Sequence, residues 1–288
     1  MKTGFYPGCS LKGSSREYGE SVVALARALG MPLEEIDDWN CCGASSAHAV
    51  DKKLSLALPA RVLALAAAQG MDEVVVPCAA CYNRLMSTRH TLEKDSALKG
   101  ETEKIIDMPL GDVRILNVMQ WIERYAAPVL AEKVVTPFRH TVACYYGCLL
   151  VRPTKVISGD RAEDPRSLDE LMIKAGAKPI DWAFKTECCG GGLSISSTES
   201  VGRLSADVLG DAVSRGAEAV IVACPMCHSN LDMRRPYIDK YLGSKADMPV
   251  MYITQALGLA VGLGEKELGL HRHFVPVNFK QEQTQCQK

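Results

Sequence analysis

The sequence predicts an α/β protein made of two tandem, repeated α/β halves related by a pseudo-twofold. Each half is expected to hold a small parallel sheet flanked by helices. Three observations carry this prediction. The chain has 288 residues, of which 47% are hydrophobic, so it can bury a sizeable core. Short β-rich runs alternate with segments of helical apolar spacing, and the same cysteine-containing words occur once in each half of the chain.

The alternation of short and long apolar segments sets the order of the expected elements. Val, Ile and Tyr in short runs indicate buried strands, whereas apolar residues spaced three and four apart indicate helices. The expected strands are Thr3–Tyr6, Val74–Val76, Thr141–Ala143 and Ala219–Ala223. The expected helices are Glu17–Leu29, Lys52–Ala68, Ser167–Ala175 and Thr198–Ser214. Strands that alternate with helices predict a parallel α/β layer in each half.

An internal repeat divides the chain. F-Y-P-G-C-S-L at 5–11 matches C-Y-Y-G-C-L-L at 144–150, and N-C-C-G-A-S at 40–45 matches E-C-C-G-G-G at 187–192. V-V-V-P-C-A-A-C at 74–81 matches V-I-V-A-C-P-M-C at 220–227, and a fainter echo pairs 117–122 with 252–257. The fainter echo suggests that each repeat ends in its own helix. We predict two repeats, 1–136 and 137–288, with the boundary in the segment between Pro128 and Arg139.

Charge and hydropathy limit the classes of partner. Lys plus Arg number 33 against 34 for Asp plus Glu, so nothing indicates a general attraction to nucleic acid or to an anionic membrane. The first residues lack the apolar core of a signal peptide, and the apolar run from Leu54 to Ala68 is interrupted by Pro59 and Arg61. We therefore expect a cytoplasmic protein that is not inserted directly into a membrane.

Twelve cysteines are unusual for such a protein, because the cytosol keeps thiols reduced. They are expected to be ligands or redox groups rather than disulfides. Cys41 and Cys42 are adjacent, and consecutive Cα atoms about 3.8 Å apart lie too close for a relaxed disulfide. Four other cysteines follow the ends of predicted strands, where open α/β sheets place their ligand sites. Five thiols per half can therefore converge at one sheet edge.

The chemistry of the five-cysteine sets leaves alternatives. A C-x-x-C motif by itself fits zinc, a redox dithiol or an iron-sulfur cluster. The three further cysteines of each half argue against a simple dithiol, and zinc takes four ligands, so zinc remains the alternative for one half. Iron-sulfur clusters use cysteine thiolates and can share neighbouring sulfurs. Gly43 and Gly190, which lack a Cβ, allow a sharp turn close to such a cluster.

The complete pattern resembles the CCG-domain, or cysteine-rich domain, proteins, and in particular the B subunit of heterodisulfide reductase. The resemblance covers essentially the whole chain. It implies that each set holds a non-cubane [4Fe-4S] cluster and that the two clusters face a disulfide bound between the halves. The implied ligands are Cys9, Cys41, Cys42, Cys78 and Cys81 in the first half, and Cys148, Cys188, Cys189, Cys224 and Cys227 in the second.

The resemblance also implies a function and partners. The chain is expected to be the catalytic iron-sulfur subunit of a heterodisulfide reductase-like complex that reduces, or in reverse forms, a small-molecule disulfide. It lacks the ferredoxin-type cysteine run, so electrons are expected to arrive from a ferredoxin-like C subunit with two [4Fe-4S] clusters, itself fed by a flavin-containing A subunit. The alternatives are an electron-transfer CCG subunit of a lactate- or glycolate-type oxidoreductase, and a zinc-bound scaffold without a redox role.

Other residues near the predicted sites receive smaller roles. His48 and His228 are candidates to donate a proton to a product thiolate. Cys144 aligns with Phe5 in the repeat, so a packing role beside the site is expected for it. Cys286 lies in a polar tail, where an exposed thiol is expected.

Overall fold

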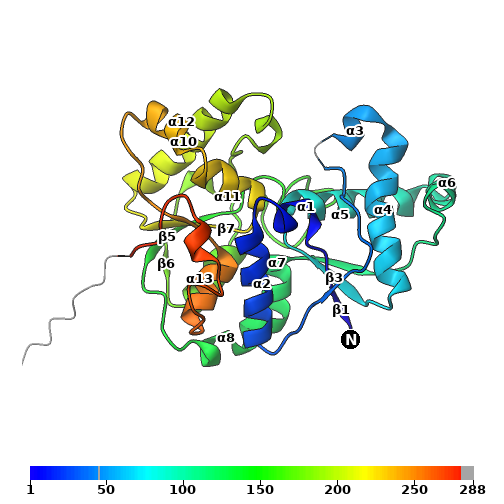
Figure 1. Ribbon diagram of the computed structural model, residues 1–288, viewed down its shortest axis with the longest axis horizontal. Helices are drawn as coiled ribbons and strands as arrows, with labels where there is room; N and C mark the ends of the chain where they lie inside the picture. Colours follow the sequence, from blue (N-terminus) through cyan, green and yellow to red (C-terminus); the bar gives the residue numbers. More distant parts are fainter. Residues whose placement is uncertain (45, 280–288) are drawn as a thin grey trace, which may run out of the picture.

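The computed structural model describes residues 1–44 and 46–279, and its strands form two four-stranded parallel sheets (Figure 1). The sheets have the same topology, with orders β2-β1-β3-β4 and β6-β5-β7-β8. The strands of the first sheet are β1 (Thr3–Phe5), β2 (Glu34–Glu35), β3 (Glu73–Val76) and β4 (Arg114–Asn117). Those of the second are β5 (Thr141–Tyr145), β6 (Lys178–Pro179), β7 (Ala219–Val222) and β8 (Val250–Tyr252). The predicted pair of repeated parallel α/β halves is confirmed.

Helices flank both sheets. Those that precede β5 are α1 (Gly8–Lys12), α2 (Arg16–Ala28), α3 (Ala47–Val50), α4 (Lys52–Ala68), α5 (Ala79–Lys94), α6 (Ser96–Ile106), α7 (Val118–Trp121), the π-helical turn η1 (Ile122–Ala126) and α8 (Ala127–Lys133). Those that follow it are α9 (Ser167–Lys174), η2 (Ala183–Thr186), η3 (Gly191–Leu193), α10 (Thr198–Ser214), α11 (Pro225–Asp232), α12 (Arg235–Leu242), α13 (Ile253–Ala260) and η4 (Leu270–Arg272).

The central strands and long helices agree with the sequence predictions. Helices α4 and α10 have the predicted bounds, α9 ends one residue earlier than predicted, and α2 both begins and ends one residue earlier. The four strands β1, β3, β5 and β7 are those predicted, each within two residues at either end. The four edge strands were not predicted: β2 and β6 contain only two residues each, and β8 and β4 contain three and four, too few to show a clear period.

The faint echo between 117–122 and 252–257 has a structural basis. In both halves a glutamine three residues into the segment accepts a hydrogen bond from the backbone N–H at its start: Asn117 N to Gln120 Oε1 at 3.1 Å, and Tyr252 N to Gln255 Oε1 at 2.9 Å. Such a reciprocal cap satisfies an orphan donor at a helix start. The shared glutamine therefore begins a helix, α7 or α13, at the end of each sheet, as the repeat suggested.

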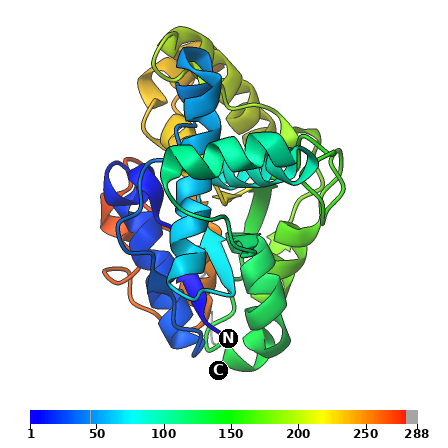
Figure 2. The same cartoon turned by 90° about the vertical axis from the view of Figure 1, so that its right-hand side faces the viewer.

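The two halves pack through an extensive shared interface. Helix α2 of the first half lies beside α13 of the second, as both Figure 1 and Figure 2 show. Between them the buried hydroxyls of Ser21 and Thr254 are 2.7 Å apart. Arg272 Nη2 pairs with Glu20 Oε1 at 3.0 Å at the rim of the same interface. Apolar residues of both halves belong to one continuous core, so the boundary near residue 136 remains a prediction about the repeat rather than about separate cores.

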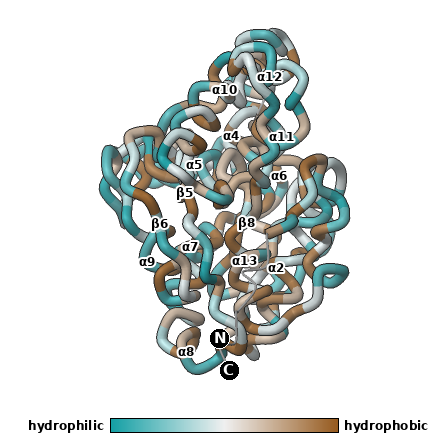
Figure 3. Tube along the Cα trace, turned by 90° about the vertical axis from the view of Figure 1, so that its left-hand side faces the viewer, coloured by the Kyte–Doolittle hydropathy of each residue, from teal (hydrophilic) through white to brown (hydrophobic). Residues whose placement is uncertain are grey.

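The apolar residues lie mainly in the sheets and in the helices between the halves. The tube through β8 and α13 is largely brown in Figure 3, whereas many of the outer segments are teal. Helix α4, which contains Pro59, packs against α5 and α6 of the first half. Within 1–44 and 46–279, no helix is long and apolar enough to cross a membrane.

Candidate metal centre

The five predicted cysteines of the first half come together at the carboxyl edge of β1 and β3. Cys9 lies in α1, and its Sγ is 3.9 Å from that of Cys41. Cys42 Sγ is 3.1 Å from Cys81 Sγ, and Cys81 in turn hydrogen-bonds with Cys78, the residue that precedes α5. A chain of short sulfur contacts thus links members of the set, with all five at one end of the first sheet.

The second half repeats this arrangement. Cys189 Sγ lies 3.6 Å from Cys227 Sγ, and Cys227 also hydrogen-bonds with Cys224, the residue that precedes α11. Cys148 hydrogen-bonds with Cys188. The pairing of the first cysteine with the first of the adjacent pair, and of the second of the pair with C-x-x-C, is the same in both halves.

Burial gives each set an inner and an outer side. The inner thiols are fully buried in both halves: Cys42, Cys78, Cys81, Cys189, Cys224 and Cys227. Cys9, Cys41 and Cys188 are exposed, and Cys148 is half-buried. Among the described residues, the open side of each set is therefore the side of its first cysteine and the first member of its adjacent pair.

The glycine after each cysteine pair has a definite conformational role. Gly43 and Gly190 have φ values of +69° and +80°, in the left-handed region that glycine adopts without a steric penalty. This turn aims a backbone N–H back at sulfur: Gly43 N lies 3.4 Å from Cys41 Sγ, and Gly190 N lies 3.3 Å from Cys188 Sγ. Backbone N–H groups aimed at a thiolate stabilise its negative charge.

One cysteine of each adjacent pair is acidic: Cys188 in the second half and Cys42 in the first, where hydrogen bonding with Cys42 instead raises the pKa of Cys41. Hydrogen bonding with Cys148, together with the N–H groups of Gly190 and Gly191, lowers the pKa of Cys188 to about 5 despite partial burial. Hydrogen bonds with Cys41 and Cys81 lower the pKa of Cys42 to about 3. Each set thus contains a cysteine that is a thiolate at neutral pH, which is the form that binds metals.

A second glycine pair, not singled out from the sequence, touches the sulfurs directly. Gly8 and Gly147 occupy equivalent positions in the repeat and have φ values of +61° and +65°. A Cβ added to Gly8 would lie 3.2 Å from Cys81 Sγ, and one added to Gly147 would lie 2.9 Å from Cys227 Sγ. The absence of a side chain lets the backbone approach the second cysteine of each C-x-x-C motif.

An equivalent tyrosine anchors each CCG loop. Tyr6 Oη donates to Asn40 O at 2.8 Å, and Tyr145 Oη donates to Glu187 O at 2.6 Å; both acceptors immediately precede the cysteine pair. Burial and the neighbouring cysteines of the same set raise the pKa of both phenols, so both stay protonated as donors. The repeat contained this signal, because tyrosine stands at the same place in F-Y-P-G-C and C-Y-Y-G-C.

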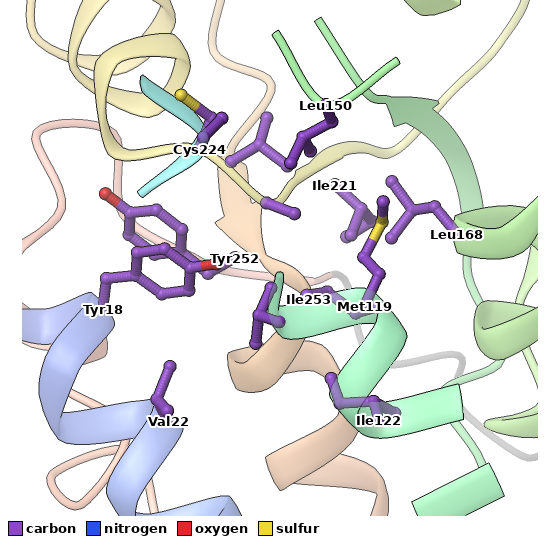
Figure 4. Close-up of a cluster of buried hydrophobic side chains, with 14 of the residues drawn as sticks. Tyr18, Val22, Met119, Ile122, Leu150, Leu168, Ile221, Cys224, Tyr252 and Ile253 are labelled. Atoms are coloured by element: carbon purple, nitrogen blue, oxygen red, sulfur yellow. The ribbon is translucent and has the colours of Figure 1, made fainter. Parts of the chain in front are cut away.

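A buried aromatic stack lies where the two halves meet. Tyr18 of α2 stacks on Tyr252, with ring centroids 4.0 Å apart and planes at 4° (Figure 4). Tyr18 Oη lies 3.5 Å from Pro77 O, next to Cys78, and burial raises its pKa, with Cys224 and Cys78 raising it further. The same phenol therefore adjoins the first cysteine of C-x-x-C in both halves.

A polar contact also joins the outer parts of the two sets. Asn83 of α5 donates from Nδ2 to Leu149 O at 3.3 Å and to Arg152 O at 2.7 Å. It thereby ties the loop that follows Cys148 to the helix that carries Cys81. Together with Tyr18, this contact links segments that carry cysteines of the two sets.

His228, a predicted proton donor, is buried behind the second set. Its ring stacks on Tyr252, and its Nε2 lies 3.1 Å from Val250 O and 3.4 Å from His273 Nδ1. Burial lowers its pKa well below the usual value. Its role as a proton donor remains a prediction, and Nε2 is directed toward the backbone of β8.

The ligating atoms of His228, Asp232 and His273 lie within 4.8 Å of one another, which is metal-site geometry. Their hydrogen bonds favour a different reading. Gln255 Oε1 accepts from Tyr252 N, so its Nε2 is the donor to His273 Nε2 at 2.8 Å. Neutral His273 must then carry its hydrogen on Nδ1, the atom that would bind a metal. We read these side chains as a closed hydrogen-bond network.

The remaining sequence candidates have the following positions. His48 is exposed, and its Nδ1 lies 2.9 Å from Arg84 Nη2, so its proposed proton-donor role also stays a prediction. Cys144 is buried within β5, where its carbonyl accepts from Trp182 Nε1 at 3.1 Å, in keeping with a packing role. Cys286 lies outside the described residues.

The donor sets fit iron-sulfur chemistry. Each half offers five thiols, backbone N–H groups directed at sulfur, and a glycine in place of a side chain beside the second cysteine of C-x-x-C. A tetrahedral zinc ion would leave one of the five thiols unused. This duplicated cluster of cysteines is the feature to compare with known proteins.

The model of the CCG cysteine-rich domain matches residues 3–86 and 142–232, which contain both sets. The chain belongs to the CCG cysteine-rich domain family. This agrees with the resemblance seen in the sequence, including that to the B subunit of heterodisulfide reductase.

Two relatives that match nearly the whole chain extend the comparison. The chain is 31% identical to the 8-methylmenaquinol:fumarate reductase membrane anchor subunit of Wolinella succinogenes, over 94% of this chain and 96% of that protein. It is 31% identical to the B subunit of the ferredoxin:CoB-CoM heterodisulfide reductase of Methanosarcina mazei, over 95% and 94%. Both relatives are named as subunits of oxidoreductases, which supports a redox role within a complex for this CCG protein.

A solved structure shares the fold. A hypothetical protein from Helicobacter pylori superposes with a TM-score of 0.80 at 15% identity, covering 97% of this chain but 53% of that chain. At this identity the likeness concerns the fold alone.

Proposed function

We propose that this CCG protein is the iron-sulfur catalytic subunit of a heterodisulfide reductase-like complex. In this proposal two non-cubane [4Fe-4S] clusters, one per cysteine set, reduce or in reverse form a disulfide bound between the halves. The observation that carries the proposal is the duplication of a complete five-thiol set on two sheets of identical topology. The full-length similarity to heterodisulfide reductase B subunits supports the same function.

The arrangement suits a two-electron reaction at a disulfide. Reduction breaks the S–S bond, takes up two electrons and two protons, and releases two thiols. The clusters, when bound, would supply the electrons one at a time. The residues that the chain contributes are the ligands and the groups that hold them: Tyr6 and Tyr145 anchor the CCG loops, and Gly43 and Gly190 direct N–H groups at sulfur.

The exposed cysteines indicate the side from which a substrate would enter. The outer cysteines Cys9, Cys41 and Cys188 are exposed, whereas the inner cysteines are sealed by packed core residues. Leu193 and Ile195 follow the second CCG segment and are 41% and 94% exposed. Exposed apolar side chains beside a redox site are typical of a docking surface. We propose that a ferredoxin-like C subunit, connected to a flavin-containing A subunit, delivers electrons on this side.

A single-turnover experiment tests the proposal. Anaerobically purified chain is reduced with dithionite, desalted, and mixed with an asymmetric alkyl disulfide while visible absorbance and released thiol are followed. The expected result is re-oxidation of the chain with one disulfide cleaved per two electrons. Cys189→Ser should abolish thiol release, whereas Cys144→Ala, which removes a buried cysteine outside both sets, should not. Re-oxidation that never releases thiol would contradict the proposal.

The similarity to the fumarate reductase subunit favours a second candidate, an electron-transfer CCG subunit that handles no disulfide. This is the same class as the lactate- or glycolate-type alternative raised by the sequence. In the single-turnover experiment such a subunit would be re-oxidised by a quinone analogue or a dye and would leave the disulfide intact.

A further inference from the structure

A buried amide lies against the second cysteine set. Asn230 of α11 is 1% exposed, and its Nδ2 lies 3.1 Å from Cys189 O and 3.5 Å from Cys189 Sγ. The latter is an amide N–H directed at the sulfur of a proposed cluster ligand. None of the roles assigned to the site above uses this contact.

The orientation of this amide is fixed by its neighbours. Arg234 Nε, which can only donate, lies 3.2 Å from Asn230 Oδ1, and Ser194 Oγ donates to the same oxygen at 3.1 Å. Oδ1 must therefore face Arg234, which leaves the NH₂ group facing Cys189. Arg234 is itself held by Ser194 O at 2.6 Å and by Thr198 Oγ1 at 3.2 Å.

In the described part of the first half, no side-chain amide stands at the equivalent position. The C-x-x-C motifs align Cys81 with Cys227, so the residue equivalent to Asn230 is Arg84. Arg84 is half-buried, and its Nη2 reaches toward the exposed ring of His48 at 2.9 Å. Arg234 likewise aligns with Thr88, whose side chain has no charged donor to fix the orientation of an amide. The repeat that supplies ten equivalent cysteines therefore diverges at this position.

We propose that Asn230 is a positioning residue that raises the reduction potential of the cluster in the second half and makes the two clusters inequivalent. The inference rests on the proposed function, since it requires a cluster on Cys189. Hydrogen bonds to ligand sulfurs are among the factors that set iron-sulfur potentials, because a donor stabilises the more negative, reduced state. Through Asn230, the second site would retain an electron more readily than it would with its thiolates alone.

EPR-monitored redox titration of the full chain tests this assignment. In Asn230→Leu, which keeps the approximate shape and removes the donor, one of the two clusters should become about tenfold harder to reduce. That factor corresponds to about 59 mV for a one-electron couple. The other cluster should keep its wild-type potential, and iron content should be unchanged. Ser205→Ala is the matched control, because Ser205 Oγ bonds the Cys189 carbonyl at 3.5 Å and not its sulfur; both potentials should stay as in wild type.

A measurement on the native amide covers the case in which Asn230→Leu fails to assemble. In a Cys42→Ser chain that retains only the second cluster, side-chain ¹⁵N-labelled asparagine should give a hyperfine coupling to that cluster. An iron-loaded Asn230→Leu chain with two unchanged potentials, or a labelled chain without coupling, would overturn the inference alone. A wild-type chain without iron would instead overturn the proposed function as well.

Discussion

Substitution of Gly147 by alanine tests whether Cys227 is held in place by a cluster. Gly147 has a φ of +65°, and the added Cβ would lie 2.9 Å from Cys227 Sγ. Non-bonded contacts of this kind relax toward about 3.5–4.0 Å, so the sulfur must move by more than about half an ångström. Metal–ligand distances tolerate only about 0.2 Å. In the cluster-free chain, by contrast, the side chain of Cys227 can rotate away.

A control variant separates the steric effect on Cys227 from the backbone cost of placing an L-residue in the left-handed region. An L-residue in the left-handed region costs about 1–2 kcal/mol, which applies equally to Gly216, with a φ of +76° and no atom within 4 Å of an added Cβ. Both Gly147→Ala and Gly216→Ala should therefore lower the melting temperature of the cluster-free chain by a similar few degrees. Only Gly147→Ala should lose iron, from about eight to about four per chain. Equal iron in the two variants, measured colorimetrically, would refute the argument that the glycine makes room for a ligated sulfur.

Three further predictions concern the cysteine sets. Cys42→Ser and Cys189→Ser should each remove about half of the iron and leave the other half's EPR signal intact; unchanged iron in both would show that the ligand assignment is wrong. Tyr6→Phe and Tyr145→Phe each delete one hydrogen bond to a CCG loop and should lower the free energy of unfolding by about 1 kcal/mol in urea titrations. Each variant should also lose iron to a chelator faster than the wild type. Iron loss at the wild-type rate would argue that the tyrosines do not anchor the loops. In cluster-free protein, hydrogen bonding with Cys148 and the N–H groups of Gly190 and Gly191 lower the pKa of Cys188 to about 5, so Cys188 is a thiolate at pH 6.5. Mass spectrometry should therefore find rapid iodoacetamide labelling of Cys188 that slows below pH 5. Because an unfolded cysteine has a pKa of about 8.5, labelling in urea at pH 6.5 should be much slower, and equal rates would contradict this stabilisation of the thiolate.

The repeat predicted the fold and the grouping of cysteines because both depend on local pattern. Cysteines that follow parallel strands must meet at one sheet edge, and the structure brings the members of each set together there. Gly43 and Gly190 were expected to allow a sharp turn, and their positive φ values confirm it.

The features that the sequence did not reveal depend on tertiary packing. Nothing local shows that Tyr18 and Tyr252, which are 234 positions apart, stack between the sites. The role of Asn230 depends on Arg234 and Ser194, which fix the direction of its amide. The burial of His228 against Val250 and His273 likewise follows from how the segment after η4 packs on α11, and its proximity to Cys227 in sequence gave no indication of it.

Iron and acid-labile sulfide analysis of the anaerobically purified chain, with EPR after oxidation in the presence of a thiol, tests the central claim most directly. About eight irons per chain and a signal that appears only when thiol is present are the predicted results. Zinc without iron, or iron with an EPR signal that is indifferent to thiol, would contradict the account of two clusters that act on a disulfide.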